Sequence, residues 1–337
     1  MRIRLGRLAC AAMLSSLPIA AQAADKTEVS IAFVGDVMLA DTPGKLIRAG
    51  RDPFAPFSAR LAAADIRVAN LECVVSATGR PDPAKPWSFR AHPRVLKRVK
   101  RHFDAVALAN NHSGDYGPRA FADMLERLEH AGIGYFGGGR TLAAAHAPLI
   151  LEREGLRIAL LGYNEFFPRW FEADFDKPGI AWSEDEQVML DIEQARRIHH
   201  ADIVIPVMHW GWEHEPLASD RQRQLARRMI DAGADAVVGG HPHVVQDIEI
   251  YRGRPVIYSL GNFVFDGFDT PATTTGWLLE LQVDRAGARA FRTTVASIDR
   301  EGTPHPAAPS SSLCWNVGQS AAGACPSRRS PEFVEKE

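Results

Sequence analysis

The sequence has little net charge, no internal repeat and few long apolar runs. A formal net charge of −2 over 337 residues leaves no electrostatic footprint for nucleic-acid binding. After residue 23 no apolar run approaches the ~20 residues that a helix needs to cross a bilayer, which argues against a stable transmembrane span. With 46% hydrophobic and 24% charged residues, the composition is that of an ordinary soluble globular protein.

The amino-terminal segment carries the one marked apolar run. Arg2, Arg4 and Arg7 precede an apolar stretch over residues 8–20, and small residues follow it. This order predicts a signal peptide over residues 1–23, and the run is short for the alternative, a membrane anchor. Cleavage would remove three arginines and no acid, changing the net charge from −2 to −5. We therefore expect a secreted or periplasmic protein.

Cysteine is also scarce, with four in the chain. Two of them, Cys314 and Cys325, lie close together near the carboxyl end, where they could form a small-loop disulfide or remain free thiols. The sequence around them is rich in proline, serine and alanine, a composition that buries little surface. We expect one domain over residues 24–302 and a loosely ordered tail over residues 303–337.

Five predicted strands each end in a polar residue of metal-ligand type. The strands, rich in β-branched and apolar residues, span 27–34, 66–69, 105–109, 203–208 and 236–238. Helical patterns at 118–132 and 220–232 alternate with strands, which indicates a parallel sheet. Further strand signals at 157–162, 248–251, 256–260 and 277–283 favour a second, mixed sheet packed on the first. The aromatic segment 164–183 reads as a long loop able to cover a site.

The polar residues at these strand ends form a candidate metal site, because the carboxyl ends of parallel strands share one edge of a sheet. A single histidine or carboxylate is more often structural than a ligand. Two imidazoles separated only by Pro242, however, have little packing rationale. Mixed nitrogen and oxygen ligands suit Mn, Fe, Zn or Co better than a calcium or magnesium cage. The candidate ligands are Asp36, Glu72, Asn111, His209, His241 and His243.

Six motifs in order resemble the CapA (PgsA-like) capsule-synthesis family, which belongs to the calcineurin-like metallophosphoesterase superfamily. They are Gly35–Leu39, Ala69–Glu72, Ala109–His112 with Asp115–Gly117, His209–Gly211 with Glu213, Gly240–His243 and Ser259–Phe263. The resemblance implies an α/β fold, a four-layer α/β/β/α sandwich of two mixed sheets. It also implies a role in making or exporting a poly-γ-glutamate capsule.

The resemblance further implies a role for each ligand. Asp36 and His243 would hold one divalent ion, Asn111, His209 and His241 a second, and Glu72 would bridge them. His112 would protonate the leaving group as the catalytic residue. Met38 stands where hydrolytic members often have a histidine, and Glu72 where they have an aspartate, so the chain is expected to bind one or two ions.

Three residues near the ligands are candidates for substrate binding. Glu213 and Asn262 are expected to contact an anionic polymer or phosphoester, and Trp210 either lines the pocket or packs in the core. Three functions remain open. The protein acts in capsule polymer synthesis or export, with or without phosphoester hydrolysis; it is a free-standing phosphodiesterase or nucleotidase; or it is a non-catalytic scaffold for the polymer or for synthase and export proteins.

Overall fold

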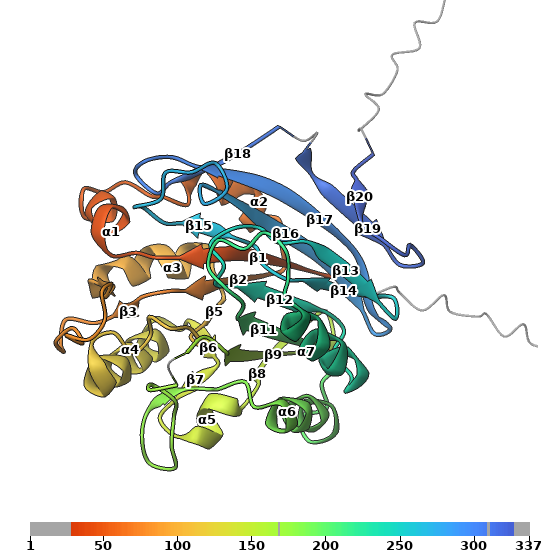
Figure 1. Cartoon of the computed structure of the whole chain (residues 1–337), viewed down its shortest axis with the longest axis horizontal. Coiled ribbons are helices and arrows are strands. Elements are labelled where there is room, and N and C mark those ends of the chain that lie inside the picture. The colour runs from red at the N-terminus through yellow and green to blue at the C-terminus, as the bar shows by residue number, and fades with distance from the viewer. Residues whose placement is uncertain (1–27, 168, 309–310, 327–337) are drawn as a thin grey trace, which may run out of the picture.

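The computed structural model describes residues 28–167, 169–308 and 311–326. The predicted signal peptide, residues 1–23, lies outside these ranges. Two β-sheets face each other, and helices cover the outer face of each (Figure 1). The four-layer α/β/β/α arrangement expected from the sequence is confirmed.

The first sheet has ten strands, in the order β20-β19-β17-β16-β1-β2-β5-β6, with β15 also paired to β1 and β18 to β17. β1, β2, β5 and β6 run parallel, whereas β16 and β17 are antiparallel neighbours. The strands are β1 Val29–Val37, β2 Ile66–Leu71, β5 Ala105–Ala107, β6 Gly134–Phe136, β15 Asn262–Val264, β16 Thr275–Asp284, β17 Gly287–Ile298, β18 Pro304–Pro306, β19 Leu313–Asn316 and β20 Gly323–Ala324.

The second sheet has six strands, in the order β13-β14-β12-β11-β9-β8. Its four central strands are parallel, and the edge strands β8 and β13 are antiparallel. The strands are β8 Leu149–Arg153, β9 Leu156–Asn164, β11 Ile203–His209, β12 Val237–Gly240, β13 Ile248–Tyr251 and β14 Arg254–Ile257. Two short ribbons pair β3 Val74–Val75 with β4 Arg90–Ala91, and β7 Gly138–Gly139 with β10 Gly179–Ile180.

The helices have the local signals expected of them. In α4 the buried residues Phe121, Leu125 and Leu128 recur at helical spacing, and Gly132 ends the helix in the left-handed region at φ 64°. A capping box between Ser219 and Gln222 begins α7. The helices are α1 Asp41–Arg48, α2 Ser58–Ala62, α3 Leu96–His102, α4 Gly117–Ala131, α5 Leu142–His146, α6 Asp185–Arg197 and α7 Asp220–Asp231, with 3-10 turns η1 Ala55–Phe57 and η2 Pro93–Val95. None of the helices in the described ranges is long and apolar enough to cross a membrane.

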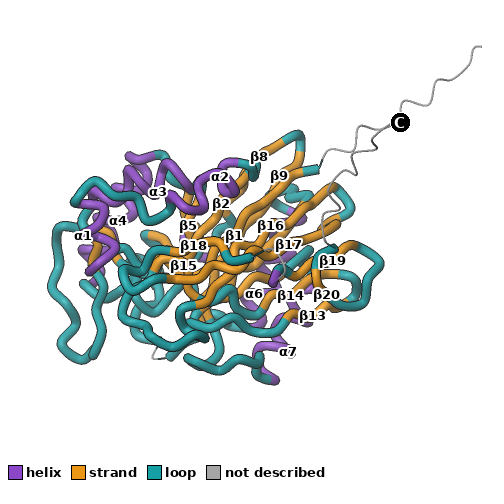
Figure 2. The backbone as a smooth tube through the Cα atoms, turned by 90° about the horizontal axis from the view of Figure 1, so that it is seen from above, coloured by secondary structure: helices purple, strands orange, loops and turns teal. Residues whose placement is uncertain are grey.

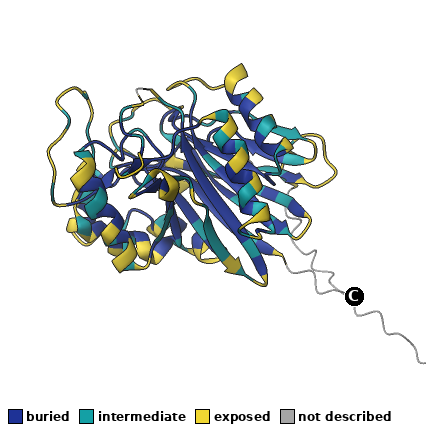
Figure 3. Cartoon of the chain, turned by 90° about the horizontal axis from the view of Figure 1, so that it is seen from below, coloured by how far each residue is buried: buried dark blue, intermediate teal, exposed yellow. Residues whose placement is uncertain are grey.

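Central strands such as β1, β9, β11 and β12 are buried on both faces, which explains their nearly continuous apolar runs (Figure 3). In β1, Ile31 and Phe33 pack between the sheets, whereas Ala32 and Val34 pack against the helices of the first sheet. A third cluster fills the space between the second sheet and its helices. Figure 2 shows the helices gathered outside the strands.

The segment after residue 302 differs from the loosely ordered tail that we expected. Strand β19 extends the first sheet by pairing with β17, and Trp315 is fully buried beside Phe291, with ring centroids 5.9 Å apart. Cys314 and Cys325 form a disulfide. The expectation was wrong up to residue 326, because one buried tryptophan and one cross-link fix a polar segment that composition alone assigns to solvent.

Candidate metal centre

The six predicted ligands meet where strands of both sheets end. Ligand atoms of Asp36, Glu72 and His209 lie within 4.8 Å of one another. Glu72 Oε1 is 3.6 Å from both His209 Nε2 and His243 Nε2. His209 Nε2 is also 2.8 Å from Asn111 Oδ1 and 3.2 Å from His241 Nδ1. The candidate ligands therefore form one cluster, and all except Asn111 are buried.

Two asparagines that we did not predict hold this cluster together. Asn70 Nδ2 donates to Asp36 Oδ1 at 2.8 Å and lies 3.2 Å from His209 Nδ1. Asn70 therefore contacts a candidate ligand from each sheet. Asn110 Nδ2 donates to Asn70 Oδ1 at 3.0 Å. Both residues stand just before a ligand in the sequence, and that proximity was the only signal available. Their amides orient the ligands without occupying a ligand position.

The loop after β12 is strained where it presents its two histidines. His241 and His243 have φ values of 96° and 56°, which non-glycine residues rarely adopt and which cost on the order of 1–3 kcal/mol each. A Cβ at Gly240 would lie 2.7 Å from Asp36 Oδ1, so glycine permits the close approach of this loop to β1. The His241 N–H donates to Asp36 Oδ2 at 3.2 Å. The fold thus tolerates strain to place both imidazoles.

Several polar atoms in the cluster have no hydrogen-bond partner within the described part of the chain. They are both carboxylate oxygens of Glu72 and Nε2 of His241. A buried polar atom without a partner costs free energy, and a cation bound between these atoms would remove that cost. The donor set of imidazole nitrogens, carboxylates and one amide oxygen fits a divalent transition metal. The residues present therefore fit the implied metal.

The pKa values of the candidate ligands shift in different directions. Burial, reinforced by the charge of Asp36, raises the pKa of Glu72 well above its usual value. Burial and the neighbouring imidazoles lower the pKa of His209 and His241 well below theirs, so both are neutral and able to bind a metal. Burial also opposes protonation of His243, but its hydrogen bond with Asp36 outweighs this and raises its pKa.

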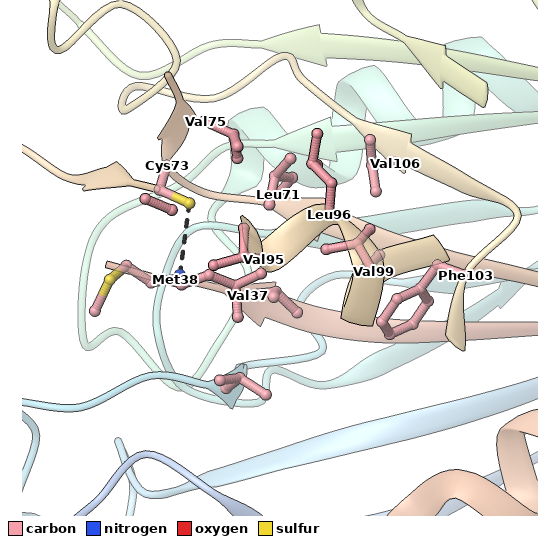
Figure 4. Packing of buried hydrophobic residues seen from close by; sticks show 14 of the residues in the cluster. Val37, Met38, Leu71, Cys73, Val75, Val95, Leu96, Val99, Phe103 and Val106 are labelled. Carbon is pink, nitrogen blue, oxygen red and sulfur yellow. Dashed lines mark hydrogen bonds between the residues drawn. The ribbon is translucent and has the colours of Figure 1, made fainter. Parts of the chain in front are cut away.

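Met38 does not take part in the cluster. It is buried with Val37 and Leu39 in the apolar layer between the first sheet and its helices, close to Cys73 (Figure 4). The N–H of Ala40 donates to its sulfur at 3.2 Å. Met38 is therefore part of the core, and an ion held beside Asp36 would gain no nitrogen ligand from this position.

His112 is held by a network that the sequence did not predict. Its Nδ1 lies 2.7 Å from Asp115 Oδ2, and the ring of Phe89 packs on its ring at 4.5 Å between centroids. Lys85 pairs with Asp115 and donates to the backbone oxygen of Asn111 at 2.6 Å. Burial lowers the pKa of His112 despite the opposing carboxylate of Asp115. Asp115 is three residues after His112, a spacing that could have suggested the pair.

The predicted substrate-binding residues fall into three different environments. Glu213 is exposed, and its charge raises the pKa of both Glu72 and His243, so it lies near the cluster at the surface. Asn262 is buried, with Oδ1 2.8 Å from His243 Nδ1, and so orients a ligand rather than facing substrate. Trp210 is fully buried, and its indole N–H donates to the Tyr258 carbonyl, so its assignment to the pocket was wrong.

The segment after β9 covers part of the cluster. The ring of Phe166 packs on His241, with centroids 4.1 Å apart. Beside it is a pocket lined by Asn111, Asn164, Trp170 and Trp182, among others. Asn164 Oδ1 is buried there without a hydrogen-bond partner in the described ranges. The lining of this pocket joins the candidate ligand Asn111 to the segment after β9.

Two mixed sheets between helical layers, with aspartate, asparagine and histidine side chains at the strand ends of both sheets, define a calcineurin-like metallophosphoesterase fold. Within this class, the chain belongs to the family of the bacterial capsule synthesis protein PGA_cap, whose model matches residues 30–267. It is 34% identical over 283 residues to the PGA biosynthesis protein CapA of Bacillus subtilis, covering 82% of this chain and 73% of that protein.

A second relative is the capsule biosynthesis protein CapA of Bacillus anthracis. It is 32% identical over 250 residues, which cover 72% of this chain and 61% of the relative. The chain therefore spans only part of the length of these curated relatives.

Solved structures with a related shape are more distant. NAD nucleotidase of Haemophilus influenzae aligns with 83% of this chain and 54% of its own, at 13% identity and a TM-score of 0.45. The sulfate thiohydrolase SoxB of Thermus thermophilus aligns with 79% and 56%, at 12% identity and a TM-score of 0.46.

Proposed function

We propose that the protein is an exported, metal-dependent phosphoric ester hydrolase that acts in the synthesis or export of an anionic capsule polymer. The hydrolase proposal rests on buried atoms that have no hydrogen-bond partner in the described ranges, namely both carboxylate oxygens of Glu72 and Nε2 of His241. It also rests on His112, whose ring is oriented by its contact with Asp115. Family membership supports the capsule setting, with polymer synthase or export proteins as partners. The amino-terminal sequence supports a periplasmic or secreted location.

The cluster divides into two groups of ligands around Glu72. Bound divalent ions would acidify a water molecule and polarise the phosphoryl oxygens, which is the chemistry that such ions supply in phosphoesterases. Manganese, iron, zinc and cobalt are the candidates, in one or two copies. Asp36 and His243 would hold one ion, Glu72 would lie between the two, and Asn111, His209 and His241 would hold the other.

His112 is suited to protonate the leaving-group oxygen. Because Asp115 accepts the Nδ1 proton, the proton available for transfer is on Nε2, and the transfer requires the doubly protonated ring. Asp115 favours that cation, whereas burial and the charge of Lys85 oppose it. An anionic phosphoester in the pocket would add a further favourable charge. Phe89 and Phe166 restrict water beside the histidines on which they pack.

The test is to purify the chain without residues 1–23, supply Mn, Fe, Zn or Co, count the bound metal and assay phosphomonoester and phosphodiester hydrolysis. We expect stoichiometric metal and a kcat that falls ~10²–10⁴-fold in His112→Ala, the usual contribution of a general acid. His130→Ala, at an exposed histidine on α4, is the matched control. Metal binding without hydrolysis across the panel would contradict the hydrolase proposal.

That outcome would support a second candidate, a metal-stabilised scaffold for the polymer or its synthase. The observation that favours the scaffold is Met38, which removes a nitrogen ligand from the ion near Asp36. An incompletely held ion could stabilise the strained loop of His241 and His243 without activating water.

A further inference from the structure

The helical layer on the first sheet exposes many positive charges that have no carboxylate partner. Residues 41–62 and 93–102 contain nine lysines and arginines but only two acids, Asp41 and Asp52, in a chain whose formal net charge is −2. Seven of the nine are exposed and have no carboxylate oxygen within 4.0 Å in the described ranges. These seven, called the basic face below, are Lys45, Arg48, Arg60, Arg94, Lys97, Lys100 and Arg101.

The centre of the basic face is one side of α3. Leu96 and Val99 bury the other side of this helix, which leaves Lys97, Lys100 and Arg101 exposed at spacings of three and four residues. At this spacing like charges are neighbours on the helix surface and repel one another.

The acids closest to this helix already have partners. Asp52 pairs with His102 and Arg98, and Asp104 pairs with Arg67. Helix α1 contacts η2 and α2 contacts α3, so the seven cations lie on adjoining elements (Figure 2). None of the seven cations forms an ion pair within the described ranges, so no direct pairing relieves the repulsion among them.

The helices of the second sheet show that the fold can pair its arginines. On α7, Arg221 and Arg228 both pair with Asp185, and Arg223 and Arg227 both pair with Glu249. The surface of α1–α3 therefore differs in pairing from that of α7. Unpaired cations gathered on one face are the surface that a polyanion would neutralise.

We propose that the basic face binds an extended anionic polymer of the polycarboxylate class. The choice of polymer rests on the proposed role in capsule assembly. α1–α3 have no exposed large apolar side chain; those of the described chain lie elsewhere, for example Trp87, Phe175 and Trp212. The face thus lacks the apolar anchors of a membrane-binding surface and the aromatic platforms on which single-stranded nucleic acid stacks.

The binding test uses poly-γ-glutamate as the probe and three substitutions on the basic face. Arg60→Gln, Lys97→Gln and Arg101→Gln are combined, because these side chains make no hydrogen bond or ion pair in the described structure. The control combines Lys177→Gln, Arg197→Gln and Arg300→Gln, which are also exposed and without ion pairs there and change the net charge equally.

We expect the unaltered chain to bind the polymer with an affinity that falls as salt rises, because binding releases counterions. The triple variant of the basic face should bind at least about tenfold more weakly and with a shallower salt dependence, whereas the control should bind normally. Equal loss in both variants, or no binding by the unaltered chain, would overturn the proposal. Tighter binding to phosphatidylserine vesicles or to an oligonucleotide of equal charge would overturn the choice of partner.

Hydrolysis of a small phosphodiester, measured on the same samples, separates this inference from the proposed enzyme activity. Neither triple variant changes a residue of the metal cluster or of the His112 network, so both should retain the activity of the unaltered chain. A chain that binds the polymer but hydrolyses nothing would contradict the enzyme and leave the basic face standing. A chain that hydrolyses the ester but binds no polymer would contradict polymer binding by the basic face and leave the enzyme proposal standing.

Discussion

The two sheets contribute opposite chemistry to the metal centre. Asp36, Glu72 and Asn111 from the first sheet supply oxygen atoms, whereas the second sheet supplies imidazole nitrogens from His209 and the loop after β12. Burial raises the pKa of Glu72 and lowers that of His209, which favours the neutral form of each. His209 and His241 are therefore ready to bind a cation, whereas the raised pKa values of Glu72 and His243 favour their protonated forms, which compete with a cation.

Several contacts bridge these halves, among them that of His209 Nε2 with Asn111 Oδ1 at 2.8 Å. Asn70 approaches both, with Nδ2 2.8 Å from Asp36 Oδ1 and 3.2 Å from His209 Nδ1. The His241 N–H also donates to Asp36 Oδ2. A bound cation would add the strongest link, so metal binding should tie the two sheets together at this edge. Substitutions can remove imidazole ligands and oxygen ligands separately.

Removing two of the three imidazoles should cause the largest loss of bound metal. In His241→Ala combined with His243→Ala, we expect the bound metal to fall to background, a loss beyond the ~10–100-fold that substitution of a supporting residue costs. Hydrolysis should be lost with it. Metal content by mass spectrometry and circular dichroism check both metal and fold, with His130→Ala combined with His305→Ala as the control pair. Retention of a full metal complement would refute the site.

Removing a charge from the oxygen half should have two effects of opposite sign. Glu72→Gln should weaken metal binding at least ~10-fold, because it removes an anionic ligand. It should also raise the melting temperature of the metal-free protein at neutral pH, because folding no longer has to bury this carboxylate or take up a proton on it. Thermal unfolding in EDTA and with added metal measures both. A metal-free variant less stable than the parent would show that Glu72 has a structural partner.

The sequence predicted that these ligands converge, because each lies at or just after the end of a buried strand, and strand ends at one sheet edge meet. It did not predict the bonds of Asn70 to Asp36 and His209, since these join segments 34 and 139 residues apart that no local pattern relates. The alternation of side chains along β11 should have excluded Trp210 from the predicted substrate-binding residues. Ile203 and Ile205 pack between the sheets, so the residue after His209 must point to the opposite face, into the helical layer.

The carboxyl end was mispredicted for a different reason. Composition describes the average tendency of a segment to bury surface, and residues 303–326 are polar on average. Strand β17, which no sequence signal had suggested, offers an edge on which β19 pairs, and Trp315 then fills a space beside Phe291. A single long-range pairing thus decided the structure of a segment whose own residues favour solvent.

Removing support from one imidazole should have an intermediate effect. Asn262 Oδ1 lies 2.8 Å from His243 Nδ1, which leaves Nε2 free for the metal. Asn262→Ala should lower metal affinity by ~10–100-fold without removing a ligand, whereas Asn262→Asp, which keeps the acceptor, should recover most of it. Competition with a fluorescent chelator measures the affinity. Equal loss in both variants would mean that Asn262 acts through the Thr273 carbonyl, to which its Nδ2 donates at 2.9 Å.

The smallest effect should appear in the pH dependence of the metal-free protein. His209 and His241 have lowered pKa values when folded, so as pH falls the unfolded chain takes up their protons first, near its ordinary histidine pKa of ~6.5. The stabilising contribution of His209 and His241 should be fully present above that pH and fall below it by up to about 1.4 kcal/mol per pH unit for each histidine.

His243 opposes this decline, because its raised pKa adds stability that is present below ~6.5 and lost as pH rises through its pKa in the folded state. The raised pKa of Glu72 acts in the same direction as His243, because it too adds stability that is lost as pH rises. In urea unfolding in EDTA, the change in stability from pH 8 to pH 5 should therefore be less unfavourable in His241→Ala than in the parent. An equal pH dependence of stability in that variant and in the parent would contradict the proposed contribution of His241.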